Sequence, residues 1–170
     1  ELNQIDFGSY KKVNFIFNQF QPSVLLNNFD SPVDYINRSI LNTAIILEYI
    51  KKEKINVHKI IYTSSSSVYG DNHLCEEDDL LAPKGMHGCL KLANEKLIKF
   101  FCQEMNIDYS IARIFNMYGG NDKFSVVNKI ITSLLQNKTF NLINNGNSIR
   151  DFIHIDDVVC AYKKLLDSKN

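Results

Sequence analysis

The sequence contains a run of residues without alternation between apolar and polar positions, Lys59-Ile60-Ile61-Tyr62-Thr63, followed directly by four serines. A strand with one face in water alternates in polarity, whereas a strand covered on both faces is a continuous run rich in β-branched residues. A second run of this kind extends from Tyr109 to Phe115. Strands buried on both faces are typical of parallel sheets with helices on each side, so these runs favour an α/β fold.

Helical patterns alternate with these strands. The clearest predicted helix covers residues 34–52, where apolar residues form a broad stripe: Ile36, Ile40, Leu41, Ala44, Ile45, Leu47 and Ile50. A second covers residues 88–105, with Leu92, Leu97, Ile98 and Phe101 as candidate core positions. The other predicted elements are a mainly helical segment at 10–20, a short strand at 23–26, a helix at 126–136, extended segments at 140–143 and 152–155, and a last helix capped by Asp156 or Asp157. This order predicts βαβ units and a parallel sheet.

Composition excludes several classes of protein. The chain has 170 residues with 19 Lys+Arg and 19 Asp+Glu, so the net charge of zero argues against nucleic acid as a partner. No apolar run approaches the ~20 residues that cross a bilayer, and the first residues do not resemble a secretion signal. The four cysteines form no CxxC pair, which favours reduced thiols and a cytoplasmic location.

Four separated motifs occur in a characteristic order. They are Tyr62-Thr63-Ser64-Ser65-Ser66-Ser67-Val68-Tyr69-Gly70 at the end of the buried strand, Pro83-Lys84-Gly85-Met86-His87-Gly88-Cys89-Leu90-Lys91 continuing to Glu95, Arg113-Ile114-Phe115-Asn116-Met117-Tyr118-Gly119, and the run from Gly146 to Val158 that contains Arg150-Asp151-Phe152-Ile153-His154. Together they resemble the NAD-dependent epimerase/dehydratase family, the extended short-chain dehydrogenases that act on nucleotide sugars.

The resemblance implies a function and a set of site residues. The implied reaction is NAD(P)-dependent hydride transfer at a sugar carbon, leading to epimerisation or dehydration of a nucleotide sugar. Ser65 matches the residue that hydrogen-bonds the reacting hydroxyl. Lys91 matches the lysine that lowers the pKa of the family's catalytic tyrosine and holds the cofactor ribose. Phe115 matches a position that lines the nicotinamide, and Asn116 one that lines the substrate. Arg150 matches the arginine that neutralises the diphosphate.

The position of the family's catalytic tyrosine is occupied by His87. Imidazole accepts a proton near neutral pH, so His87 is the candidate acid/base. Its ring nitrogens lie closer to the backbone than a phenol oxygen would, and the nearby charge of Lys91 disfavours imidazolium. A catalytically inactive remnant, acting as a nucleotide-sugar-binding or dimerising module, therefore stays open as an alternative.

The sequence departs from the family in its glycines as well as at His87. The family opens with a GxxGxxG turn that brings backbone amides to the cofactor pyrophosphate, and this sequence, with seven glycines, contains no such motif. The resemblance therefore implies a doubly wound, Rossmann-like parallel sheet that is incomplete at both ends. It divides the chain into a partial NAD(P)-binding domain (1–120) and the start of a substrate-binding portion (121–170).

Two further expectations concern partners. The family commonly dimerises through the helix of the YxxxK motif and its neighbour, which implies a homodimer through helices near 34–52 and 87–105. A remote alternative is a zinc-binding module, because His73-x-Cys75 and His87-x-Cys89 are two matched pairs of ligand residues. Structural zinc sites favour two to four residues between paired ligands, so the expectation is that no metal is bound.

Overall fold

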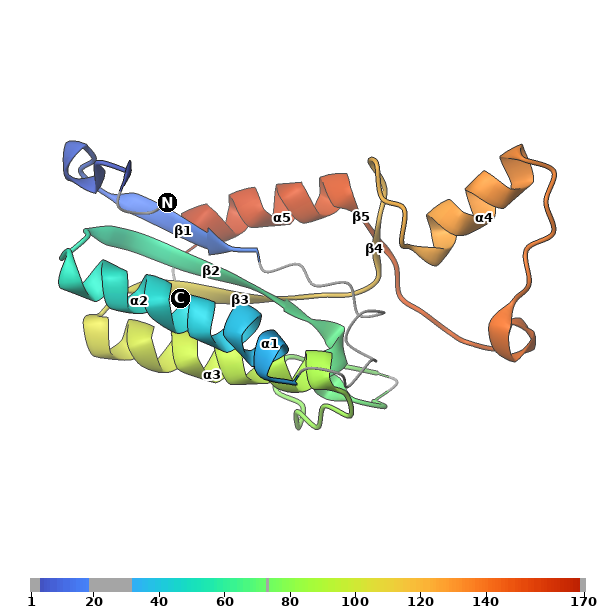
Figure 1. Cartoon of the computed structure of the whole chain (residues 1–170), viewed down its shortest axis with the longest axis horizontal. Helices are drawn as coiled ribbons and strands as arrows, with labels where there is room; N and C mark the ends of the chain where they lie inside the picture. Colours follow the sequence, from blue (N-terminus) through green and yellow to red (C-terminus); the bar gives the residue numbers. More distant parts are fainter. Residues whose placement is uncertain (1–3, 19–31, 73, 169–170) are drawn as a thin grey trace. The chain divides into compact units, whose positions relative to one another are not determined.

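The computed structural model describes residues 4–18, 32–72 and 74–168 (Figure 1). The chain divides into two compact units, one formed by Glu1–Arg113 with Leu165–Asn170 and the other by Ile114–Lys164. The assignment of a cofactor-binding and a substrate-binding part to the chain stays a prediction.

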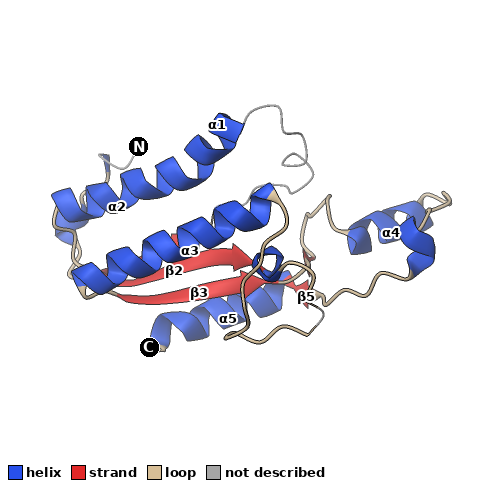
Figure 2. Ribbon diagram, turned by 90° about the horizontal axis from the view of Figure 1, so that it is seen from below, coloured by secondary structure: helices blue, strands red, loops and turns tan. Residues whose placement is uncertain are grey.

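The first unit is built on a three-stranded sheet in the order β1-β2-β3. The strands are β1 (Val13–Phe17), β2 (Val57–Ser65) and β3 (Asp108–Ile114). Strand β1 pairs in parallel with β2, with Phe17 opposite Tyr62, and the arrows of β2 and β3 point the same way in Figure 2. The parallel sheet and its buried central strand are confirmed.

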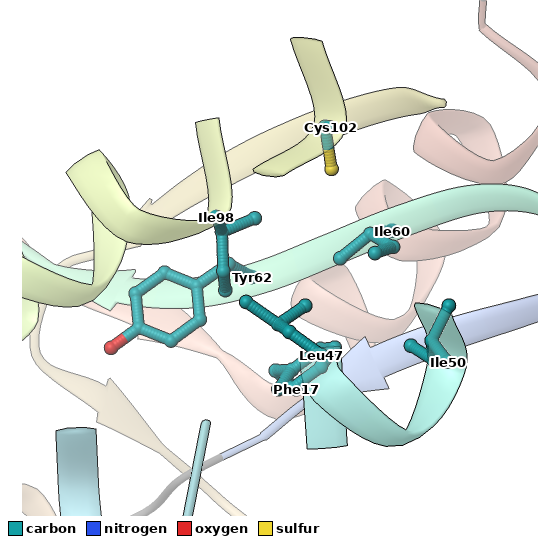
Figure 3. Packing of buried hydrophobic residues seen from close by; sticks show 7 residues of the cluster. All are labelled: Phe17, Leu47, Ile50, Ile60, Tyr62, Ile98 and Cys102. Carbon is teal, nitrogen blue, oxygen red and sulfur yellow. The ribbon is translucent and has the colours of Figure 1, made fainter. Parts of the chain in front are cut away.

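Two long helical segments lie on one face of this sheet (Figure 2). The first consists of α1 (Pro32–Ile36), a π-helical turn η4 (Asn37–Leu41) and α2 (Asn42–Lys52), and the second is α3 (Met86–Met105). Their buried apolar side chains meet those of the sheet in one cluster (Figure 3): Phe17, Leu47, Ile50, Ile60, Tyr62, Ile98 and Cys102. The helices predicted at 34–52 and 88–105 are confirmed, and so are Leu47, Ile50 and Ile98 as core residues.

The predicted apolar stripe of the first helix is wrong in its N-terminal half. Ile36, Leu41 and Ile45 are exposed, whereas Ser39 and Thr43 are buried. A π-helical turn contains one residue more than an α-turn and so shifts the phase of the helix. Here it directs the small polar side chains inward. Thr43 then donates to the Ser39 carbonyl (2.9 Å), and Asn94 donates to the Ser39 hydroxyl (2.8 Å).

Three other predicted elements differ from the structure. The segment predicted as mainly helical at 10–20 contains strand β1, because pairing with β2 places Phe15 and Phe17 against the core. The final helix, α5 (Ile155–Asp167), begins before Asp156 and Asp157, which lie in its first turn and do not cap it. At 140–143 no strand forms, and the 3-10 turn η6 (Ile143–Gly146) begins at its end. The strand predicted at 23–26 lies outside the described residues.

The second unit contains the two-stranded parallel sheet β4 (Met117–Tyr118) with β5 (Ile153–His154), and helix α4 (Val126–Leu135). Ser125 caps α4 by accepting from the Asn128 amide (3.1 Å). Directly after β4, Gly119 has a φ of 109°, and a Cβ there would lie 2.4 Å from Nε2 of His154. Only glycine fits this turn against the imidazole. Among the described helices of both units, none is long and apolar enough to cross a bilayer.

Candidate active site

Ser65 lies where the central strand ends. It is the last residue of β2 and the N-cap of a 3-10 turn, η5 (Ser66–Tyr69). Its Oγ accepts from the Ser67 amide (3.2 Å) and from the Ser67 hydroxyl (3.0 Å). Open α/β sheets bind their ligands at the carboxyl ends of their parallel strands. Ser65 lies at this end of the sheet.

The first turn of α3 packs closely against η5. Gly88 makes this possible, because a Cβ at that position would lie 2.5 Å from the Ser67 carbonyl oxygen and 2.8 Å from Cβ of Pro83. The close approach joins the turn that follows Ser65 to the helix that carries His87 and Lys91. The structure therefore brings together the elements bearing the three predicted catalytic residues.

We expect Gly88→Ala to destabilise the chain, although alanine is ordinarily the better helix former. The added methyl meets backbone atoms that must move, which costs about 1–3 kcal/mol of unfolding free energy. Urea unfolding of the variant checks this. The matched control is Gly85→Ala, because a Cβ at Gly85 has nothing within 4 Å. Equal stabilities of the two variants would contradict the close packing.

Lys91 is buried in the same region. Its side chain reaches β2, where Nζ donates to the Thr63 carbonyl (2.8 Å) and lies 5.2 Å from the ring centroid of Tyr62. Burial of the ammonium disfavours its charge and lowers the pKa of Lys91 to about 8. Lys91 therefore stays mostly charged at neutral pH, but its proton is held much less firmly than that of a surface lysine.

His87 lies one helical turn before Lys91. Both ring nitrogens are buried, and neither has a hydrogen-bond partner in the part of the chain that the structure describes. Burial lowers the pKa of His87, and the positive charge of Lys91 lowers it further. The imidazole is therefore neutral at neutral pH, and its unprotonated nitrogen is an acceptor for a hydroxyl group. Buried polar atoms of this kind normally have a hydrogen-bond partner, so the lack of one among the described residues points to a ligand.

The effect of Lys91 on His87 gives a direct test. Lys91→Met is expected to raise the pKa of His87, because removal of a neighbouring positive charge favours imidazolium. A titration of the imidazole proton signals by NMR measures the shift. Lys84→Met is the control, since Lys84 is exposed and pairs with Asp71. A His87 pKa that is unchanged by Lys91→Met would show that the two side chains do not interact.

The other predicted site residues belong to the second unit. Asn116 is exposed and donates from Nδ2 to the Asp151 carbonyl (2.7 Å), which places it beside the segment that contains Arg150. Arg150 is exposed and donates to the carbonyl of its neighbour Ile149 (2.8 Å). Phe115 is half-buried. The structure thus joins Asn116 to the segment of Arg150 within this unit.

Sequence reasoning missed a buried ion pair beside the site. Glu95 is two turns after His87 on α3, where the sequence is equally compatible with a solvated helix face. Its side chain is only 5% exposed and pairs with Arg113 at two points, Nε to Oε1 (3.1 Å) and Nη2 to Oε2 (3.0 Å). The signal in the sequence is spacing, because His87, Lys91 and Glu95 are four residues apart and share one face of the helix.

The predicted pairs of zinc ligands show no metal geometry. Cys89 is exposed, and Cys75 directs Sγ to the Asn72 carbonyl (3.5 Å). His73 lies outside the described residues. In the described ranges, no three histidine, cysteine or acidic side chains gather where they could hold a metal ion.

Helices packed on a parallel sheet, with polar side chains at the carboxyl end of its central strand, define a Rossmann-type α/β protein. The family model described as the NAD dependent epimerase/dehydratase family matches residues 3–170, and the chain belongs to this family. NAD(P) is the cofactor of this family, and its members act on nucleotide sugars.

Similar proteins agree with this assignment. The chain is 30% identical to a putative UDP-glucose 4-epimerase from Methanocaldococcus jannaschii over 95% of its length, and 27% identical to protein CapI from Staphylococcus aureus over 97%. It superposes with a TM-score of 0.85 on a mutant UDP-glucuronic acid 4-epimerase from Bacillus cereus in complex with UDP-4-deoxy-4-fluoro-glucuronic acid and NAD, at 26% identity over 100% of this chain. These matches cover 55%, 53% and 55% of the respective proteins, so the chain spans about half of their length.

Proposed function

We propose that this chain forms the proton-transfer part of a site for NAD(P)-dependent hydride transfer at a nucleotide-sugar carbon, in an epimerase or a dehydratase. The observation that carries the proposal is the half-buried imidazole of His87, whose two ring nitrogens are both buried. It has no partner among the described residues and lies one turn from the buried ammonium of Lys91, at the position where the family has its catalytic tyrosine. This arrangement is suited to receiving a hydroxyl group.

Each of the three residues has a distinct role in this proposal. Ser65 accepts two hydrogen bonds from Ser67, and its own hydroxyl proton is directed to the oxygen of the sugar hydroxyl. His87 accepts the proton of that hydroxyl. Lys91 donates a hydrogen bond to the Thr63 carbonyl, and its ammonium is proposed to donate to the ribose hydroxyls.

These residues fit the nicotinamide-ribose end of NAD(P). When bound, NAD(P) supplies the hydride acceptor and returns the hydride to the sugar carbon. Phe115 is proposed to line the nicotinamide. Asn116 and Arg150 are proposed to hold the nucleotide sugar, with the guanidinium of Arg150 on the diphosphate because its forked donors match phosphate oxygens. The similar B. cereus epimerase is in complex with a UDP-sugar derivative and NAD.

The lowered pKa of His87 makes it a weak base, so we expect slow turnover from the unmodified chain. The same observation favours a second candidate function, a catalytically inactive module that binds nucleotide sugar or dimerises. The proposed dimer forms through the helices near 34–52 and 87–105, where Ile36, Leu41, Ile45 and Phe100 are exposed. A cytoplasmic location and the lack of a nucleic-acid partner are part of the proposal.

Two measurements test the proposal. Incubation with UDP-, GDP-, CDP- and dTDP-sugars plus NAD, followed by separation of the sugar products, measures turnover. Calorimetric titration with each nucleotide sugar and with NAD measures binding. Slow conversion of one sugar supports the enzyme, and binding without conversion supports the inactive module. Neither binding nor conversion of any of the four classes would overturn both the enzyme and the nucleotide-sugar-binding module, and elution as a monomer on a sizing column would overturn the dimerising module.

A further inference from the structure

We propose that the ion pair of Glu95 and Arg113 positions Ser65 by holding the chain on both sides of it, at Ser64 in β2 and at Tyr69 in the turn η5. Ser65 is one of the proposed site residues, so the kinetic consequence of this inference rests on the proposed function. The structural consequence does not. The two residues act through Ser64 and Tyr69 and are positioning residues, not catalytic ones.

The chain before Ser65 is held through Ser64. This residue is buried directly before Ser65, and its Oγ donates to Oε1 of Glu95 (2.5 Å). A hydrogen bond to a carboxylate is shorter and stronger than one between neutral groups. The bond fixes the last residues of β2 against α3, the helix that also carries His87 and Lys91.

The chain after Ser65 is held through Tyr69, the last residue of η5. Nη1 of Arg113 donates to the Tyr69 hydroxyl (2.9 Å), and the guanidinium carbon lies 5.0 Å from the centroid of the Tyr69 ring. The same nitrogen donates to the Glu77 carbonyl (2.9 Å) in the acidic connection beyond the turn. One guanidinium thus ties the end of the turn to Glu95.

The ion pair fixes the position of the turn relative to α3. The bonds of Ser65 to Ser67 are local and fix the shape of the turn, but not its place relative to α3. Glu95 and Arg113 join α3 to β3 by two hydrogen bonds, and each partner also holds the chain on one side of Ser65. The hydrogen bonds of Ser64 to Glu95 and of Arg113 to Tyr69 are the two arms of this arrangement. Loss of either arm would let the Ser65 hydroxyl move relative to His87 and Lys91, and a misplaced catalytic group slows the reaction.

A role in positioning differs from a role in stability, and two substitutions separate them. Ser64→Ala and Tyr69→Phe each remove one arm and leave both residues of the ion pair in place. We expect hydrogen exchange of the Ser67 and Gly70 amides to become about 10-fold faster in each variant, because these amides bond within the turn. Exchange of the Ile60, Ile61 and Tyr62 amides in β2 stays within about 2-fold.

Lys59→Met is the matched control. Lys59 is buried in the same strand and donates to the Ser168 carbonyl (2.6 Å) and hydroxyl (3.0 Å), so it is a polar anchor that does not touch the turn. Its loss is expected to accelerate amide exchange no more at Ser67 and Gly70 than in β2. Unchanged exchange of Ser67 and Gly70 in Ser64→Ala and Tyr69→Phe would overturn the inference, and so would the same selective increase in Lys59→Met.

The kinetic arm uses the chain with His87→Tyr, in which turnover is expected to be measurable. Adding Ser64→Ala or Tyr69→Phe to it should lower kcat about 10-fold and leave KM for the nucleotide sugar within about 2-fold. A raised KM with unchanged kcat would overturn the inference. If His87→Tyr itself gives no turnover, the proposed function fails, whereas the exchange measurement still decides whether the ion pair holds the turn.

Discussion

Turnover of a nucleotide sugar is expected to rise about 10²–10⁴-fold when His87 is replaced by Tyr, the range that a well-placed general acid/base contributes. The phenol oxygen lies farther from the backbone than the imidazole nitrogens and so reaches a hydroxyl held by Ser65. Its anion is favoured by the positive charge of Lys91, whose Nζ is buried one turn away. For imidazole the same charge acts in the opposite sense and lowers the pKa.

The comparison requires a variant that fills the space without a titratable group. His87→Phe serves this purpose, and its turnover should not exceed that of the unmodified chain. The rates are measured as sugar product per chain at saturating NAD. Equal turnover with His, Tyr and Phe at position 87 would contradict any acid/base role at this position. Turnover of the unmodified chain as fast as that of His87→Tyr would contradict only the argument that His87 is a weak base.

The largest expected loss of stability follows from Arg113→Met. The substitution leaves the Glu95 carboxylate buried without its cation, and breaking a buried ion pair costs about 3–5 kcal/mol of unfolding free energy. The lower part of this range is expected, because the Arg113 side chain is 19% exposed and some water reaches the pair. Urea unfolding followed by circular dichroism gives the free energy.

A double-mutant cycle isolates the pair itself. With Glu95→Gln present, the buried negative charge is gone, so Arg113→Met should cost at least about 1.5 kcal/mol less than it does alone. The control is the exposed pair of Arg38 with Asp34, where Arg38→Met should cost less than about 1 kcal/mol. Additive effects of Glu95→Gln and Arg113→Met would mean that the two charges do not depend on each other.

The sequence by itself predicted the parallel sheet, because the continuous run at 59–63 is typical of a strand covered on both faces. It also placed Ser65 at the carboxyl end of this strand and His87 and Lys91 on one helix face, since a spacing of four residues brings side chains to the same side. These are local properties of the chain. Periodicity and order along the sequence are enough to state them.

Only the tertiary structure decided which polar residues are buried. Glu95 is chemically indistinguishable in the sequence from a surface glutamate, and it is buried because Arg113, 18 residues later, comes to lie opposite it. The π-helical turn of η4 likewise directs Ser39 and Thr43 inward in place of Leu41 and Ile45. Strand β1 formed from a segment with a mainly helical pattern because it found a partner in β2. Glu95 and β1 each depend on a partner that lies elsewhere in the chain, and the first helix depends on a shift in its phase. A distant partner and a shift in helix phase leave no periodic signal in the local sequence.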